Sequence, residues 1–268
     1  MDKYWIIGHP LDFSLSTPVL NALFKEMGIK KEFESKDIKP SGLKKVINSL
    51  REGELKGLIT TMPHKTPSIS LVDKVSEEAR KIDAVNLTIN EKGKLVSYNT
   101  DYMGAVGALK TVLPSLKGVK IHVLGAGGAA RAAAFGFQKE GALVSIWNRT
   151  PDRAKEFAEK LGIEWIEDMR TWDGKPDVIV NATSVSYQTK QSTLVPFALW
   201  EKVTTAMDAV YGKTSLFLEE ANAMNVKNLL TGELWFVNQA IPMFKLITGK
   251  EAPKKRLEEL TKEALSNL

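Results

Sequence analysis

The sequence predicts an α/β protein with two lobes, and three observations carry this prediction. Short apolar runs alternate with amphipathic segments through the first hundred residues, which is typical of strands alternating with helices. A second series of short apolar runs follows residue 120 and indicates buried parallel strands. Between the two series, a proline and a glycine interrupt the chain at residues 114–118. At 268 residues the chain is long enough for two modest domains.

The first lobe is expected to alternate strands and helices up to about residue 100. Residues 84–89 and 94–97 are β-prone and flank the turn-prone stretch Asn90-Glu-Lys-Gly93, so they predict a hairpin. The other expected strands and helices are residues 4–7, 17–27, 31–34, 41–51, 57–60 and 69–82.

The second lobe is expected to begin with a helix that crosses from the first. Thr100 or Asp101 can cap this helix, which would run to about Leu113. Further strands are expected at residues 120–124, 143–147, 178–180, 205–208 and 227–230, and helices at 152–161, 232–248 and 253–267.

The stretch from Lys120 to Ala134 is a β-type run that enters a glycine turn and leaves as an alanine-rich helix. Gly125, Gly127 and Ala130 fit the G-x-G-x-x-G/A pattern, in which small residues let a pyrophosphate approach the helix N-terminus. A second strand follows at βαβ spacing, which favours a Rossmann-type domain over a tight turn with no ligand. The turn residues expected to bind a dinucleotide are Gly125, Ala126, Gly127, Gly128 and Ala129.

The end of the strand at residues 143–147 predicts which dinucleotide binds. A cofactor without a 2′-phosphate is usually held here by an acidic residue, and this chain has none at the strand tip. Arg149 and Arg153 can instead form charge-assisted bonds to phosphate oxygens, with the Thr150 hydroxyl as a further donor and Asn148 beside them. These residues favour NADP over NAD. The alternative is that the two arginines are solvated side chains at the start of the next helix.

Composition excludes several classes of function. The chain has no cysteine, so thiol catalysis, disulfides and thiolate metal sites are excluded. Its three histidines are dispersed, so no metal site is expected, and His122 is interpreted as a satisfied core or edge histidine. The net charge of +5 is spread along the chain, which does not indicate nucleic-acid binding. The N-terminal apolar run is too short for a signal peptide or membrane span. We expect a cytoplasmic protein, monomeric or homodimeric, with a small-molecule substrate and no membrane partner.

Two polar clusters follow expected strands of the first lobe. The stretch Gly8–Pro18 carries Ser14 and Ser16 just before a helix, where hydroxyls can hold a carboxylate. The alternative is that Ser16 or Thr17 is only an N-cap. The second cluster, Thr60–Lys65, places a lysine at a strand-to-helix junction, where it can donate a proton or lie on the surface.

Two further clusters, Asp83–Asn86 and Tyr98–Asp101, make a resemblance specific. The four clusters together resemble the shikimate dehydrogenase family, whose motifs read roughly G-x-P-x-x-x-S-x-S-P-x-x-H-N, N-V-T-x-P-x-K, G-A-x-N-T and N-T-D-x-x-G. The matching residues are Gly8, Pro10, Ser14, Ser16, Asn21, Thr61, Pro63, Lys65, Ala84, Asn86, Asn99, Thr100, Asp101 and Gly104. The match continues through residues 125–131, 148–150, 181–184, 208–211 and 232–239, nearly to the end of the chain.

The resemblance implies reversible reduction of 3-dehydroshikimate by NADPH, a step of aromatic amino-acid (chorismate) biosynthesis. Hydride delivery to a carbonyl carbon leaves an alkoxide, so the site needs a cation or proton donor. The family's catalytic pair matches Lys65 and Asp101, with Asp101 holding the ammonium and a substrate hydroxyl. Whether Lys65 donates the proton or only stabilises charge stays open.

The resemblance also implies binding residues and domain boundaries. Ser14 and Ser16 would bind the substrate carboxylate together with Tyr211. The residues implied for the ring hydroxyls are Thr61, Asn86, Asp101 and Gln239, although Gln239 can also be read as a helix-surface amide. Asn181, Thr183, Met207 and Gly232 would border the cofactor; Met207 and its neighbour Val210 can equally be core residues. Residues 1–100 and 238–268 would form the substrate-binding and catalytic domain, and residues 101–237 the NADP-binding Rossmann domain.

Several positions depart from the family motifs. Ile59 replaces the usual Asn and Thr60 the usual Val, and further differences occur at Thr17, Leu20, Asp83 and Leu87. A substrate hydroxyl left unpaired in a closed pocket would cost about 1 to 3 kcal/mol, unless Thr60 or a water compensates. These departures leave two alternatives: a paralogue acting on a related acid such as quinate, or a non-catalytic NADP-binding sensor.

Overall fold

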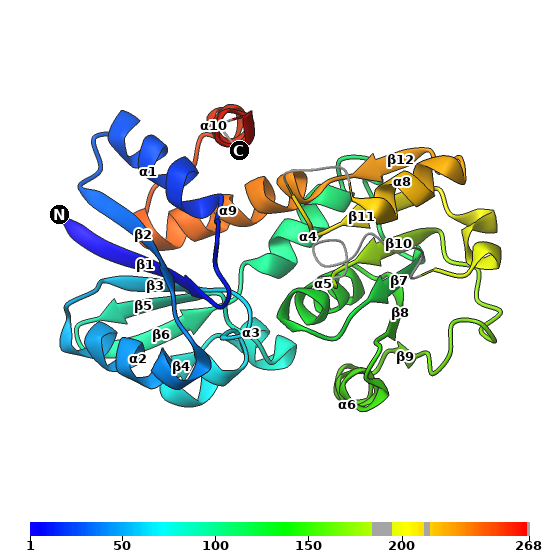
Figure 1. The fold of residues 1–268 in the computed structure, drawn as a ribbon, viewed down its shortest axis with the longest axis horizontal. Coiled ribbons are helices and arrows are strands. Elements are labelled where there is room, and N and C mark those ends of the chain that lie inside the picture. Colours follow the sequence, from blue (N-terminus) through cyan, green and yellow to red (C-terminus); the bar gives the residue numbers. More distant parts are fainter. Residues whose placement is uncertain (184–194, 212–214, 267–268) are drawn as a thin grey trace. The chain divides into compact units, whose positions relative to one another are not determined.

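A computed structural model describes residues 1–183, 195–211 and 215–266 (Figure 1). Ser184, the last residue of the 181–184 motif, and Asn267, the expected end of the last helix, lie outside these residues. The chain divides into two compact units, Met1–Thr100 with Gln239–Leu268, and Asp101–Asn238. Among the described residues, no helix is long and apolar enough to span a membrane.

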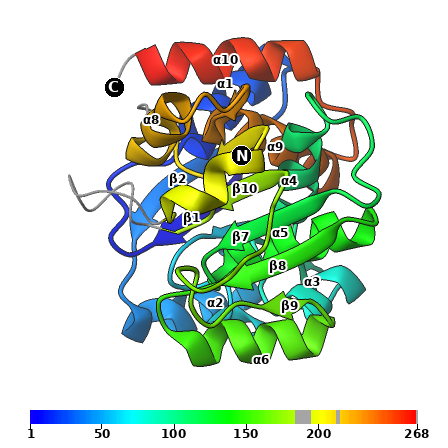
Figure 2. The ribbon, with the colours of Figure 1, turned by 90° about the vertical axis from the view of Figure 1, so that its right-hand side faces the viewer.

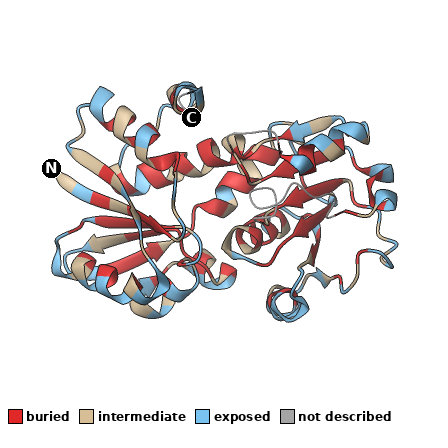
Figure 3. Ribbon diagram, viewed as in Figure 1, coloured by how far each residue is buried: buried red, intermediate tan, exposed pale blue. Residues whose placement is uncertain are grey.

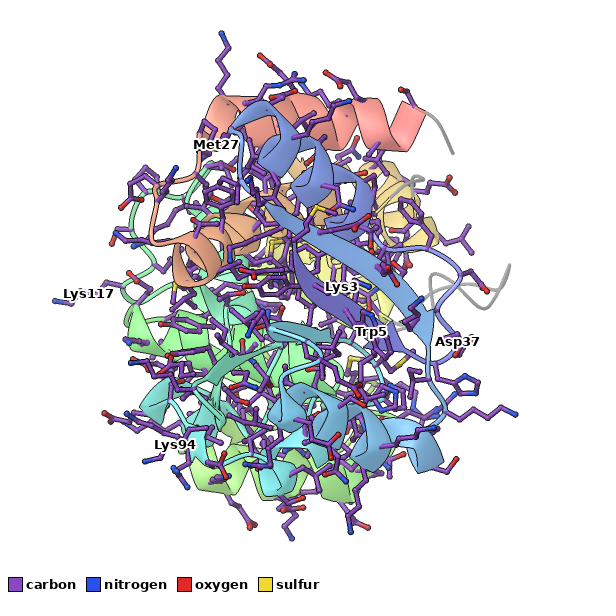
Figure 4. The ribbon with its side chains drawn as sticks, turned by 90° about the vertical axis from the view of Figure 1, so that its left-hand side faces the viewer. Lys3, Trp5, Met27, Asp37, Lys94 and Lys117 are labelled. Atoms are coloured by element: carbon purple, nitrogen blue, oxygen red, sulfur yellow. The ribbon has the colours of Figure 1, made fainter. Side chains whose placement is uncertain are left out.

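The first unit is built on a mixed six-stranded sheet. Its strands are β1 (Asp2–Gly8), β2 (Lys31–Asp37), β3 (Gly57–Thr60), β4 (Lys74–Val75), β5 (Leu87–Glu91) and β6 (Lys94–Tyr98). They lie in the order β2-β1-β3-β5-β6-β4, with β1 parallel to both β2 and β3. The predicted hairpin is confirmed: β5 and β6 are antiparallel, and Lys92 and Gly93 in their turn have positive φ angles of 55° and 88°. Figure 4 shows Lys3 and Trp5 on β1, and Asp37 where β2 ends.

Helices cover both faces of this sheet. They are α1 (Ser16–Glu26), α2 (Leu43–Glu52), α3 (Glu77–Ile82), α9 (Gly232–Thr248) and α10 (Lys254–Ser266), with the short 3-10 helices η1 (Pro40–Gly42) and η2 (Pro67–Leu71). Helix α2 packs its apolar side onto Ile7, Leu58 and Leu95. On the other face, Phe24 of α1 stacks against Phe33 of β2 and contacts Phe244 of α9. Figure 1 shows α1 and α9 on one side of the sheet and α2 on the other.

The second unit contains a parallel sheet with the Rossmann strand order. Its strands are β7 (Lys120–Leu124), β8 (Leu143–Trp147), β9 (Glu164–Trp165), β10 (Val178–Asn181), β11 (Thr205–Asp208) and β12 (Asn228–Leu230). Their order is β12-β11-β10-β7-β8-β9, and every pairing is parallel. Figure 2 shows β10, β7, β8 and β9 of this sheet side by side. Numbered within the unit, this is 6-5-4-1-2-3, whose switch point lies between β7 and β10. The predicted α/β class with a Rossmann-type parallel sheet is therefore confirmed.

Apolar side chains from both faces of the second sheet enter two cores. The helices are α4 (Asp101–Leu109), α5 (Gly128–Lys139), α6 (Pro151–Leu161) and α8 (Leu216–Ala223), with the 3-10 helix η3 (Phe197–Lys202). Helices α4, α5 and α6 share one core with Ile121 and Val123 of β7, whereas η3 and α8 share the other with Leu124. Buried residues concentrate in the strands and on the inner helix faces (Figure 3).

Some elements differ from those that the sequence predicts. Helix α4 ends at Leu109, four residues before the expected Leu113, and continues as a turn. The amphipathic segment 69–82 is interrupted, because Lys74–Val75 pairs with β6 and so divides η2 from α3. Strand β9 and helix α8 were not predicted. Strand β9 spans only two residues, and the sequence of α8 has no clear helical periodicity of apolar residues.

Candidate active site

The polar clusters lie at one edge of the first unit's sheet, and the last of them ends at Asp101, the first residue of the second unit. Strands β1 and β3 are parallel and β5 runs antiparallel between β3 and β6, so the ends of β1, β3 and β6 meet the start of β5. Main-chain hydrogen bonds join the loops that leave these strands. The Thr61 amide donates to the Ile7 carbonyl at 2.9 Å, and the His9 amide donates to the Met62 carbonyl at 2.9 Å. The first two clusters are therefore joined through their backbones.

Hydrogen bonds at Lys65 and at the preceding residue, His64, fix the loop that carries Lys65. The Val85 amide donates to the Lys65 carbonyl at 3.0 Å, which ties the loop to the third cluster. The preceding residue, His64, is 1% exposed, and its Nε2 lies 2.6 Å from the Ile38 carbonyl oxygen. Because a carbonyl can only accept, Nε2 carries the hydrogen. Both the amide and the hydroxyl of Ser68 donate to the His64 carbonyl, at 3.1 and 2.8 Å.

Sequence reasoning assigned no role to His64, and the structure makes it an anchor of the lysine loop. The bond joins residues 26 positions apart, and no local pattern indicates it. Lys65 itself is half-buried.

Asn86 joins the third cluster to the fourth. Its Oδ1 accepts the Thr100 amide at 2.9 Å, and its Nδ2 donates to the Thr100 hydroxyl at 2.9 Å. Asn99 donates from Nδ2 to the Ala84 carbonyl at 2.9 Å in the same region. Thr100 directly precedes Asp101, the first residue of α4. Asn86 therefore fixes the backbone next to the second residue of the expected catalytic pair.

The two serines of the first cluster lie at the start of α1. Ser14 is 9% and Ser16 6% exposed. The cap residue of this helix is Leu15, and no side chain caps it. The Thr17 hydroxyl lies 2.6 Å from the Ser35 hydroxyl. The interpretation of Ser16 or Thr17 as a simple N-cap is therefore wrong.

Ile59 and Thr60 occupy the end of β3. Ile59 is 6% exposed and pairs with Ile6 and Leu87 in the sheet. The Thr60 hydroxyl donates to the Val85 carbonyl at 3.0 Å. Since a hydroxyl has a single hydrogen, Thr60 in this arrangement has no donor for a ligand. It does not compensate for the donor that the usual Asn would offer.

In the second unit, the glycine turn follows β7 at the switch point of the sheet. Gly125 has φ +110°, a conformation that favours glycine, and an added Cβ there would lie 3.0 Å from the Ala182 carbonyl oxygen. Gly127 is the N-cap residue of α5, which begins at Gly128. The amides of the first turn of α5 have no helical acceptor, so this end of the helix suits a pyrophosphate.

The tip of β8 presents the residues expected to select NADP. Arg149, Thr150 and Arg153 are exposed, and Asn148 donates from Nδ2 to the Thr150 carbonyl at 2.8 Å. The sequence predicts no role for Arg131 of α5. Its Nε donates to the Ala126 carbonyl at 3.0 Å, and its guanidinium lies 5.2 Å from the centre of the Phe157 ring. Arg131 therefore ties the glycine turn to α6.

On the other side of β7, side chains join the ends of β10 and β11. Asn181 donates from Nδ2 to both carboxyl oxygens of Asp208 at 3.2 Å, and its Oδ1 accepts the Thr183 amide at 3.1 Å and the Thr183 hydroxyl at 2.7 Å. The Val210 amide donates to Asp208 Oδ1 at 3.0 Å, and the Gly232 amide to the Val210 carbonyl at 3.0 Å. Asn181, Thr183 and Gly232, three predicted cofactor residues, thus lie in one network.

The remaining predicted residues are divided between the units. Asp101 is 2% exposed and begins α4 in the second unit, whereas Lys65 belongs to the first. Gln239 is half-buried in α9, within the first unit. Tyr211, in the second unit, is half-buried with its ring 6.4 Å from that of Phe236. Met207 is fully buried in the core that α4 and α5 share.

His122 is a core residue, as expected, but it is only partly satisfied. Its Nδ1 lies 2.8 Å from the Ser145 hydroxyl, and its ring packs 4.6 Å from that of Trp172. Its Nε2 is buried with no hydrogen-bond partner in the part of the chain that the structure describes. Burial lowers the pKa of His122 from 6.5 to about 3, so the ring is neutral at pH 7. No cluster of metal-binding side chains occurs within residues 1–183, 195–211 and 215–266.

Comparisons with known proteins agree with this geometry. Residues 6–89 match the sequence model of the shikimate dehydrogenase substrate binding domain, and residues 108–199 match that of shikimate / quinate 5-dehydrogenase. A shikimate dehydrogenase (NADP(+)) of Aquifex aeolicus is 37% identical over 93% of this chain and 92% of the relative. One of Pyrococcus abyssi is 37% identical over 93% of each chain.

A solved structure extends the likeness to three dimensions. Shikimate 5-dehydrogenase of Thermus thermophilus in complex with NADP(H) and shikimate is 32% identical, with a TM-score of 0.88 over 98% of this chain and 100% of that chain. The likeness in sequence and fold spans both units. The chain therefore belongs to the shikimate dehydrogenase family.

Proposed function

We propose that the protein is an NADP-dependent shikimate dehydrogenase that reversibly reduces the ketone of 3-dehydroshikimate to the alcohol of shikimate. The observation that carries this proposal is that the four polar clusters lie at one edge of the first sheet, in a chain whose other unit has a glycine turn at the switch point of a parallel sheet. Main-chain bonds hold Lys65 beside Val85, and Asn86 holds Thr100 beside Asp101.

The residues of the second unit fit an NADP molecule. At Gly125 an added Cβ would crowd the Ala182 carbonyl oxygen at 3.0 Å, and the open first turn of α5 can accept the pyrophosphate. Arg149 follows β8, and Arg153 lies in the first turn of α6; both are exposed and would bind the 2′-phosphate. When bound as NADPH, the cofactor supplies the hydride that is transferred to the substrate carbonyl carbon.

The first unit would bind the substrate and handle the proton. Ser14 and Ser16 at the start of α1 would hold the carboxylate, and Thr61, Asn86 and Gln239 the ring hydroxyls. Lys65 would stabilise the alkoxide oxygen or protonate it, with Asp101 orienting its ammonium. Tyr211 would join the carboxylate side. Residues 1–100 with 238–268 would thus be the substrate domain, and residues 101–237 the cofactor domain.

The direct test is oxidation of shikimate by the purified chain. NADP and shikimate are mixed with the protein, and NADPH is followed by its absorbance across a range of pH. Turnover with NADP, much weaker turnover with NAD, and none without shikimate are the expected results. Absence of turnover at every pH would reject the proposal and favour an NADP-binding sensor.

A paralogue with an altered substrate is a second candidate, because of Ile59 and Thr60. The buried Ile59 side chain offers no hydrogen bond, and the Thr60 hydroxyl is already donated to Val85. A panel of shikimate, quinate and related hydroxy acids separates the two candidates. A higher kcat/KM for another acid than for shikimate would favour the paralogue.

A further inference from the structure

A buried carboxyl group at the end of β11 has no role in the chemistry described so far. Asp208 is 0% exposed, and so is Asn181 of the neighbouring strand. Strand register places the two residues directly opposite each other at the carboxyl ends of β10 and β11. This edge of the sheet lies beside the switch point, on the side of β7 away from β8.

Hydrogen-bond chemistry fixes the orientation of the Asn181 amide. The Thr183 backbone amide can only donate, so the Asn181 atom 3.1 Å from it must be the acceptor, Oδ1. The NH₂ group of Asn181 then faces Asp208, whose two oxygens both lie 3.2 Å away. A carboxylate accepts at both oxygens, whereas an amide in its place would present a donor to a donor. Asp208 is thus chemically matched to one orientation of Asn181.

That orientation connects three segments, the ends of β10 and β11 and the start of α9, and the first of them contacts the glycine turn. Oδ1 of Asn181 accepts the Thr183 hydroxyl at 2.7 Å, and the Thr183 methyl lies 3.3 Å from where a Gly125 Cβ would be. Asp208 also accepts a hydrogen bond from the Val210 amide, and the Val210 carbonyl accepts one from the Gly232 amide. An added Cβ on Gly232 would lie only 2.5 Å from the Val210 carbonyl oxygen, so these segments are in close contact.

We propose that Asp208 is a positioning residue for the nicotinamide half of the cofactor, acting through the amide orientation of Asn181. The inference rests on the proposed NADP-binding function. A dinucleotide crosses the crevice at the switch point, with its adenosine at the end of β8. The network at the ends of β10 and β11 lies on the opposite side of β7. The nicotinamide half would bind on that side.

The test exchanges the amide group at position 181 and the carboxyl group at position 208. Asp208→Asn creates a donor-to-donor contact with Asn181, and Asn181→Asp places two carboxylates together. In the double variant, the new carboxylate at position 181 can accept from Thr183 and from the NH₂ group of the new amide at position 208. The oxygen of that new amide can still accept from the Val210 amide. The probes are NADP, which spans the crevice, and adenosine 2′,5′-bisphosphate, which carries only the adenosine half. Both are titrated by calorimetry without shikimate.

Each single variant is expected to weaken NADP binding about tenfold or more, because a buried polar group loses its partner. The affinity for adenosine 2′,5′-bisphosphate and the KM for shikimate at saturating NADP should stay within about twofold. The double variant should recover NADP affinity to within about threefold of the wild type. Equal weakening of both ligands, unchanged NADP affinity, or a double variant no better than the singles would overturn the inference.

If the variants at positions 181 and 208 fail to fold, two milder variants at Thr183 test the same inference. Thr183→Val removes the hydroxyl that Oδ1 of Asn181 accepts, and Thr183→Ser keeps it. Only the valine variant should lose NADP affinity, by about three- to tenfold. Equal affinity in the two would contradict the inference. A wild type that binds no NADP would instead reject the proposed function, so the two failures are distinguishable.

Discussion

The loops at the strand ends of both units are joined by main-chain hydrogen bonds, but the buried side chains that add to these bonds differ. Main-chain bonds join Thr61 to Ile7 in the first unit and Ala209 to Asn181 in the second. In the first unit, the added bonds come from neutral side chains, such as Asn86 with Thr100. In the second unit, they include a buried carboxyl group, that of Asp208, which accepts from Asn181. Because a charged group costs more free energy to leave without a partner than a neutral one, the second pair depends more on the identity of its residues.

This difference is consistent with the proposed roles of the units. A substrate with several hydroxyls and a carboxylate needs many polar side chains, and the first unit supplies them from loops whose paths are set by backbone bonds. A dinucleotide is bound largely by backbone amides and close approach, so the second unit must fix the positions of its loop backbones, and the pair Asn181 and Asp208 adds to the main-chain bonds there. Four sets of substitutions can break or sharpen the comparison.

The largest effect is expected from Lys65→Ala in the first unit. Loss of a proton donor or cation at the developing alkoxide should lower kcat by about 10² to 10⁴-fold. Because the loop is held by the His64 and Val85 bonds, the melting temperature and the Kd for NADP should not change. The measurement is steady-state kinetics, with Lys44→Ala, an exposed lysine of α2, as the matched control. A kcat within tenfold of the wild type would contradict the role of Lys65.

The second effect concerns acid stability of the second unit. The pKa of His122 is lowered by burial from 6.5 to about 3, so the unfolded chain binds a proton between these values that the native chain does not. The contribution of neutral His122 to the free energy of unfolding is therefore fully present above pH 6.5. Below this pH the free energy of unfolding falls by up to about 1.4 kcal/mol per pH unit, until about pH 3. Urea unfolding at several pH values measures this slope. The variant His122→Leu should show a shallower slope, and an unchanged slope would rule out His122 as its source.

The third effect tests cofactor selection at the tip of β8. Arg149→Ala should weaken NADP binding about 10- to 100-fold by removing a charge-assisted bond, and should leave NAD binding nearly unchanged. Calorimetric titration of both dinucleotides measures it. Arg170→Ala is the control, since Arg170 is exposed and paired with Asp168 within the same unit. If NADP affinity proves insensitive to Arg149, it is a solvated side chain, as the alternative interpretation held.

The smallest effects compare one glycine in each unit. An added Cβ would lie 2.6 Å from Thr61 Cγ2 at Gly8, and 3.0 Å from the Ala182 carbonyl oxygen at Gly125. Overpacking of this kind costs about 1 to 3 kcal/mol. Gly8→Ala should raise the KM for shikimate alone, and Gly125→Ala the KM for NADP alone. Kinetics with each substrate varied in turn measure this separation, which would fail if either variant changed both constants together.

Much of the second unit could be predicted because its signals are local. The glycine turn, the helix that follows it and the strand at residues 143–147 occupy one continuous stretch, in which glycine geometry and apolar periodicity act over a few residues. The hairpin of β5 and β6 was predicted for the same reason, from a turn-prone segment between two β-prone runs. Helix ends were less predictable, as the early end of α4 at Leu109 shows.

The sequence by itself determined the fold class, the glycine turn and which polar residues a site could contain. Only the tertiary structure decided their partners: His64 with Ile38, Asn86 with Thr100, and Asn181 with Asp208. It also placed the Thr60 hydroxyl on Val85 and left Nε2 of His122 buried without a partner among the described residues. The physical reason is distance along the chain. Turn and helix preferences act between near neighbours, whereas these contacts depend on the order and register of strands far apart in sequence.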